Sequence, residues 1–191
     1  MILLNAIFYG FFILAIGYYS ITNLQWYSYK LNRVLFHHTK TWWHFVYFLV
    51  PFALYAFADG IGEYGFVVVI AYLTLLFQWY RGLDKPLVFT GRVKRFFAAL
   101  MLFALFIAVV FNHFAVVLPL FLAYFVSMLI EKMLFNGFKV KAQKKIEAME
   151  DLIVVGITAS YGKTSIKNYI EHLHKAKYKT YASPRSVNTL G

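Results

Sequence analysis

The chain of 191 residues contains no cysteine and few charges: only 14% of it is charged, while 61% is hydrophobic. The absence of cysteine excludes disulfides, a thiol nucleophile and any cysteine-ligated zinc or iron–sulfur centre. In soluble domains roughly a quarter of all residues are charged, so the low charge argues against an ordinary soluble domain. The high hydrophobic content argues against a disordered chain. The charges that are present are unequal, with a formal net charge of +11. In so apolar a chain this excess bears first on membrane topology.

Charged residues are missing from four long stretches, residues 2–21, 42–58, 64–80 and 96–130. A bilayer core of about 30 Å takes about 20 helical residues, so each of the first three stretches is a candidate span. The fourth would form a helix of roughly 52 Å, which is too long for one span. Its polar pair Asn112-His113 predicts a hairpin with spans at 96–111 and 114–130. One long tilted helix or a re-entrant pair is the alternative.

The basic loops predict the orientation of these spans. Residues 23–41 and 81–95 and the segment after 130 are basic, whereas the connection 59–63 carries only acids. The positive-inside rule then favours five spans, with the N-terminus outside and the C-terminal part in the cytoplasm. No span contains Asp, Glu, Lys or Arg, which argues against a pump or an ion-coupled transporter. We expect the partner of residues 1–130 to be the lipid bilayer, and we expect no nucleic acid to bind.

The histidines in this part favour structural roles. His44 and His113 stand alone near predicted span ends, where an interfacial side chain is the better interpretation. His37-His38 has no companion ligands at a metal-binding spacing and is interpreted as a loop feature.

The composition changes after residue 130. Residues 131–150 form a lysine-rich connector, interpreted as a cytoplasmic extension of the last helix that lies on anionic lipid. Residues 152–157 are apolar and β-branched over a strand's length, and 166–177 carry apolar residues at helical spacing. A second strand is predicted at 178–182. The sequence therefore predicts a helical transmembrane domain followed, over residues 151–191, by the start of a P-loop α/β domain.

The loop between the predicted strand and helix ends in Gly162-Lys163-Thr164. In a phosphate-binding loop, backbone N–H groups and a helix N-terminus face the phosphates. Lys163 would neutralise phosphate charge, and the Thr164 hydroxyl would bind Mg²⁺. The strict P-loop pattern is not met, because Ile157 stands where it requires glycine. The alternative is an ordinary helix start with a solvated lysine.

The stretch 157–167 resembles the ATP loop of the Mur ligase family, whose pattern is T-G-x-x-G-K-[ST]-[ST]. Here Ala159 stands where the family has its first glycine. The resemblance implies that ATP and Mg²⁺ are the cofactors, that Lys163 is catalytic and that Thr164 is the metal ligand. It also implies a substrate contact at Asn188 and Thr189. The ATP-binding residues would be Thr158, Ala159, Ser160, Tyr161, Gly162, Lys163, Thr164 and Ser165.

The implied activity is that of an ATP-dependent amide ligase of peptidoglycan precursor synthesis, at the inner (cytoplasmic) membrane of a bacterium. Lys167 makes the loop most similar to members that add D-Ala-D-Ala to UDP-MurNAc-tripeptide, so UDP-MurNAc-peptide and D-Ala-D-Ala are the expected partners. The resemblance covers only 151–191, and we expect the chain to be an N-terminal fragment that is inactive by itself. Two alternatives stay open: a membrane-associated ligase of γ-linked glutamate polymers, or a non-enzymatic polytopic protein or carrier with a vestigial nucleotide-binding tail.

Overall fold

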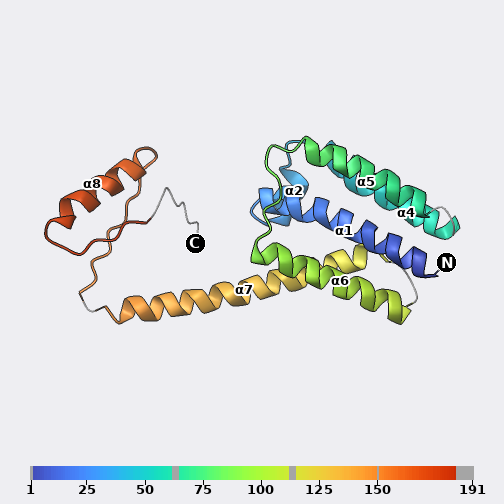
Figure 1. Ribbon diagram of the computed structural model, residues 1–191. Coiled ribbons are helices and arrows are strands. Elements are labelled where there is room, and N and C mark those ends of the chain that lie inside the picture. Colours follow the sequence, from blue (N-terminus) through green and yellow to red (C-terminus); the bar gives the residue numbers. More distant parts are fainter. Residues whose placement is uncertain (1, 62–64, 112–114, 150, 184–191) are drawn as a thin grey trace. The chain divides into compact units, whose positions relative to one another are not determined.

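The structure is a computed structural model that describes residues 2–61, 65–111, 115–149 and 151–183. It divides into two units, Met1–Lys139 and Val140–Gly191, which are treated separately below. Throughout the described residues, all regular secondary structure is helical (Figure 1).

The first unit contains four long helices, α1, α5, α6 and most of α7. They run over Ile2–Trp26, Gly65–Arg81, Gly91–Phe111 and Val117–Glu147. The short helix α2, Leu31–Phe36, follows α1. A continuous helical stretch then precedes α5 and consists of α3, the π-helical turn η1 and α4, with bounds Trp42–His44, Phe45–Leu49 and Val50–Ile61. The second unit contains α8, Lys163–Lys175.

Three helical segments are long and apolar enough to cross a membrane, namely Asn5–Trp26, Gly91–Val110 and Val117–Glu147. Two further apolar helices, Trp42–Phe57 and Gly65–Arg81, are shorter. The prediction of a helical protein suited to a membrane is therefore confirmed in its coarse form. The count of five spans and their orientation stay predictions.

The charge-free stretch 96–130 is divided between two helices, α6 and α7, which run in opposite directions (Figure 1). The polar pair Asn112-His113 at the predicted turn lies outside the described residues. Pro119 lies in the first turn of α7. Proline is tolerated there, because a backbone N–H in the first turn has no acceptor within the helix. An ion pair between Arg95, near the start of α6, and Glu131, in the middle of α7, joins the two helices. Because α7 continues past residue 130, the predicted boundary between spans and connector falls inside one helix.

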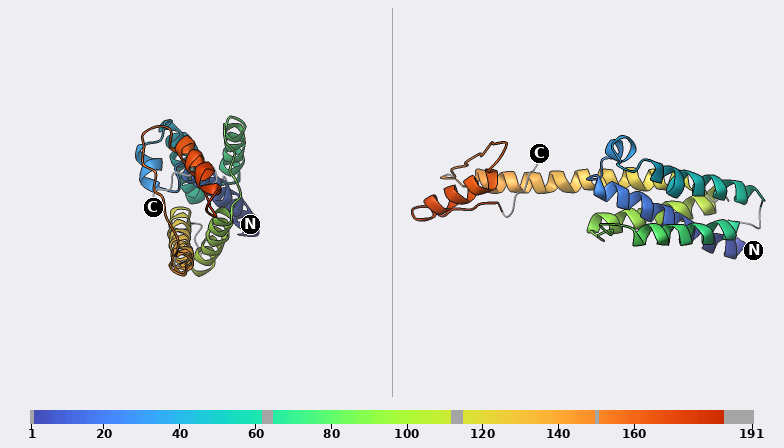
Figure 2. Two further views of the ribbon diagram at one scale, coloured as in Figure 1. Left: turned by 90° about the vertical axis from the view of Figure 1, so that its left-hand side faces the viewer. Right: turned by 90° about the horizontal axis from the view of Figure 1, so that it is seen from above.

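Helix α1 forms the centre of the first unit, between the α4–α5 pair and α6 (Figure 1 and Figure 2). The side chains of Phe12, Ile13 and Ile16 are completely buried there. Gly17 permits the close approach of α6, because a Cβ atom at this position would lie 2.5 Å from Cδ2 of Leu100.

The π-helical turn has a local cause. Pro51 has no N–H to donate to the Tyr47 carbonyl four residues earlier. The buried Tyr72 hydroxyl of α5 donates to that carbonyl instead, at 2.9 Å. The irregular turn therefore becomes a point of attachment between the η1–α4 stretch and α5.

The second unit departs from the expected α/β domain. The predicted helix is present as α8 and begins three residues earlier than the apolar spacing suggested. Residues 152–160 and 179–183 adopt neither helix nor strand, so no sheet forms within the described part of the tail. Apolar, β-branched composition favours a strand, but a strand exists only when its backbone pairs with a neighbour. Of the predicted α/β domain only the helix is therefore seen in the described residues, and the assignment of the loop before it as a P-loop stays a prediction.

Candidate functional site

The candidate phosphate loop lies between an extended segment and α8. Residues 152–157 leave their apolar side chains uncovered, with Ile153 and Val154 76% and 77% exposed. No neighbouring strand holds this segment in the described part of the tail. The geometry of the loop therefore depends on α8 and on local hydrogen bonds.

Gly162 makes the turn into α8. Its φ of 77° and ψ of 3° lie in the left-handed region, which glycine adopts without steric cost. The Gly162 carbonyl accepts the first helical hydrogen bond, from the Ile166 N–H at 2.9 Å. Because Gly162 has no side chain to cap the helix, the first-turn N–H groups of α8 find no partner within the helix itself. This end of the helix, with its positive dipole, suits an anion.

Lys163 closes the loop. It is the first residue of α8, is partly buried, and its Nζ donates a hydrogen bond to the Ala159 carbonyl at 2.5 Å. Thr164 and Ser165 follow with exposed side chains, and Tyr161 is 92% exposed. An incoming phosphate could take the Lys163 ammonium from a neutral carbonyl, since charge-assisted hydrogen bonds are the stronger kind.

Ala159, which replaces a glycine of the resembling loop, is compatible with this conformation. Among the described non-glycine residues only Ser28 and Tyr29 have a positive φ, so Ala159 keeps an ordinary backbone. The Ala159 methyl group therefore adds no backbone strain, and its carbonyl is the acceptor that orients Lys163.

An open groove of about 1340 Å³ surrounds the loop within the second unit. It is lined by the loop, by the extended segment before it and by residues that follow α8, including Thr180 and Ser183. Lys167 ties two of these parts together, because its Nζ donates to the Ser183 carbonyl at 2.5 Å. Ligand sites for small molecules occupy about 300–1,000 Å³, so the groove has room for a nucleotide.

The loop offers few protein ligands for the Mg²⁺ that would accompany ATP. Thr164 offers one hydroxyl, and no group of three His, Cys, Asp or Glu side chains stands together in the described ranges. Mg²⁺ commonly keeps several waters and binds through substrate phosphates with one or two protein ligands. A single hydroxyl is therefore compatible with Mg²⁺ that arrives with the phosphates. Asn188 and Thr189, the predicted substrate contacts, lie outside the described residues.

A second polar cluster, which the sequence did not predict, lies in the first unit. His38 is only 5% exposed, and its Nδ1 accepts a hydrogen bond from the Lys40 backbone N–H at 3.0 Å. An accepting Nδ1 means a neutral ring, whose Nε2–H then donates to Oδ1 of Asn23 at 2.9 Å. The Asn23 amide in turn donates to the Tyr19 carbonyl at 2.8 Å.

His44 extends the cluster. Its Nε2–H donates to the Val34 carbonyl at 2.9 Å, and its Nδ1 accepts from the Tyr19 hydroxyl at the same distance. His38 and His44 are thus satisfied structural groups, and the absence of a metal site at His37-His38 stays a prediction. The only sequence signal for the cluster is a polar Asn23 in an apolar helix.

No protein-family model, no curated protein and no solved structure matches this chain. The functional argument therefore depends on the residues and geometry of the loop.

Proposed function

We propose that this chain is the membrane anchor and the start of the ATP site of a Mur-type ligase, which joins D-Ala-D-Ala to UDP-MurNAc-tripeptide. The observation that carries the proposal is the arrangement around Gly162: a left-handed glycine, an uncapped helix start and a lysine at its first position, all beside an open groove. A helix start with a solvated lysine would not require the glycine conformation or the folded-back lysine.

The proposed reaction activates a carboxylate as an acyl phosphate, which an amine then attacks with release of phosphate. The first-turn N–H groups of α8 would hold the phosphates, and Lys163 would leave the Ala159 carbonyl to neutralise the charge that develops. Thr164 would direct its hydroxyl to the Mg²⁺ that accompanies the nucleotide. The proposal assigns amine and acceptor binding to further parts of the complete gene product.

The positions of the basic residues in the first unit support this proposal. The basic loops of this unit precede the candidate loop in the chain, and so does the lysine-rich end of α7, which belongs to the second unit. With the positive-inside topology, the loop would stand in the cytoplasm, where ATP is available. The anchor would keep the ligase at the membrane surface.

The test uses the complete gene product, purified in detergent, and measures phosphate release from ATP. Phosphate release should require both UDP-MurNAc-tripeptide and D-Ala-D-Ala. Lys163→Ala should lower kcat about 10²–10³-fold, which is typical of removing one electrostatic stabiliser. Lys175→Ala, at the exposed far end of α8, is the matched control and should leave kcat unchanged.

Three outcomes would contradict the proposal. Activity with a glutamate acceptor in place of the tripeptide would point to the γ-linked polymer ligase. Equal phosphate release without any acceptor, or full activity of Lys163→Ala, would favour a membrane protein with a vestigial tail.

A further inference from the structure

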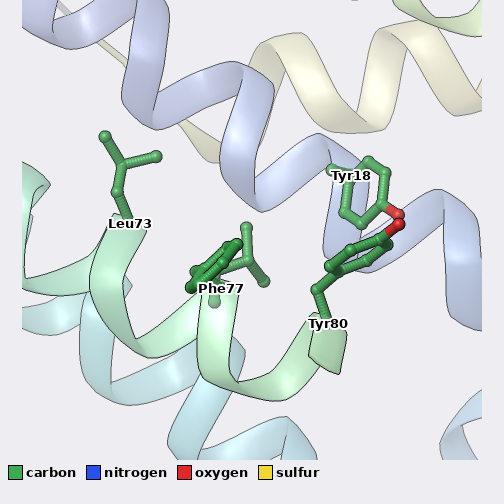
Figure 3. A pocket seen from close by; sticks show the side chains of 5 residues that line it. Tyr18, Leu73, Phe77 and Tyr80 are labelled. Carbon is green, nitrogen blue, oxygen red and sulfur yellow. The ribbon is translucent and has the colours of Figure 1, made fainter. Parts of the chain in front are cut away.

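A shallow groove opens between α1 and α5 on the outside of the first unit (Figure 3). Its volume is about 390 Å³, and it is lined by Tyr18, Leu73, Leu76, Phe77 and Tyr80. Phe77 is 60% exposed and Leu73 37% exposed. Helix α1 is long and apolar enough to cross a membrane, and α5 is a shorter apolar helix. With the five spans predicted from the sequence, this wall would face acyl chains in a bilayer.

The groove is polar at one end only. The hydroxyl oxygens of Tyr18 and Tyr80 lie next to each other at the end remote from Leu73 (Figure 3). Leu87, in the segment that follows α5, lies close to the Tyr18 hydroxyl. This end therefore adjoins the connection between α5 and α6.

That connection, residues 82–90, is fixed, and basic residues flank it. The Gln25 side chain pairs twice with the backbone of Val88, and the Trp26 indole N–H donates to the Lys85 carbonyl at 3.0 Å. These contacts hold the connection against the end of α1. The segment 81–95 carries five basic residues, Arg81, Lys85, Arg92, Lys94 and Arg95, against one acid, Asp84.

We propose that the groove binds one anionic phospholipid of the surrounding bilayer. One acyl chain would lie along Leu73, Leu76 and Phe77, and the headgroup esters or phosphate would accept hydrogen bonds from the Tyr18 and Tyr80 hydroxyls. Arg81, which directly follows Tyr80, and Lys85 in the connection favour an anionic over a zwitterionic headgroup, because each nearby Lys or Arg is worth about 1 kcal/mol towards anionic lipid. The proposal is independent of the ligase function.

The test is a titration of the purified chain in detergent, followed by native mass spectrometry. The probes are phosphatidylglycerol and phosphatidylcholine with identical acyl chains. One phosphatidylglycerol should bind about fivefold more tightly than phosphatidylcholine, the ratio that one basic side chain supplies. Tyr18→Phe with Tyr80→Phe should weaken phosphatidylglycerol about 2–10-fold for each hydrogen bond lost.

Two further variants separate the groove from the rest of the surface. Leu73→Trp fills the apolar end and should weaken both lipids equally. Tyr124→Phe removes a half-buried hydroxyl from α7, away from the groove, and should change neither affinity. Equal affinity for the two lipids, or unchanged affinity in both the double tyrosine variant and Leu73→Trp, would overturn the proposal. A shift between monomer and dimer in the groove variants would identify a second copy as the occupant and would also overturn it.

Discussion

The buried side chain of His38 connects the loop after α2 with α1 in the first unit. It accepts from the backbone of its own loop and donates to Asn23 of α1. The centroid of its ring lies 5.2 Å from that of the Tyr27 ring and 4.7 Å from that of the His44 ring. The titratable groups around it are the His44 ring, the Tyr27 phenol and Lys40, whose Nζ lies over the Trp43 ring. Protonation of the ring would break the hydrogen bond from the Lys40 N–H to Nδ1, because both nitrogens of a charged imidazole are donors.

This arrangement predicts a loss of stability in mild acid. Burial, assisted by the neighbouring His44, lowers the pKa of His38 below its usual value of about 6.5. The unfolded chain therefore binds a proton at a higher pH than the folded chain, so stability is complete above about pH 6.5 and falls as the pH falls towards the folded-state pKa. Melting temperatures in detergent between pH 8 and pH 5 measure the effect.

The control for this prediction is the adjacent histidine. His38→Gln should remove most of the slope of melting temperature against pH, whatever it does to stability itself. His37→Gln, at an exposed position, should keep the slope of the original protein. Equal slopes in all three proteins would mean that protonation of His38 does not destabilise the fold.

At the scale of helices, the contact between α1 and α6 depends on Gly17. A side chain there would collide with Leu100, which is fully buried. We expect Gly17→Val to destabilise the protein by about 1–3 kcal/mol, the usual cost of overpacking. Gly10→Val is the matched control on the same helix, because a Cβ atom at Gly10 meets nothing within 4 Å. Thermal unfolding in detergent would measure both.

A double variant identifies the clash as the cause. Leu100→Ala alone should destabilise by leaving a cavity, but together with Gly17→Val the two costs should be less than additive. Additive costs would show that the two residues do not share a contact.

The sequence predicted the helices of this protein better than its tail, for a physical reason. Charge-free runs such as 96–130 mark helices because the apolar residues of a spanning helix are contiguous in the chain. A strand at 152–157 depends instead on a neighbour that local composition does not reveal. The helix α8 was predicted from local apolar spacing, although its start at Lys163 lies three residues before the predicted one. The contacts of His38 were not, because its partner Asn23 is fifteen residues away in another element.

The whole molecule carries its positive charge unevenly, and this unevenness leads to a test of topology. The chain has no cysteine, so any cysteine that is introduced is the sole target for a thiol reagent. By the positive-inside rule, a membrane-impermeant maleimide should label Asp59→Cys in intact cells but should reach Lys85→Cys and Lys139→Cys only after lysis. Labelling of Lys139→Cys from outside would place the lysine-rich end of α7 away from the cytoplasm. The ATP site proposed for Lys163 would then lack its nucleotide, and the anchor and ligase interpretations would fail together.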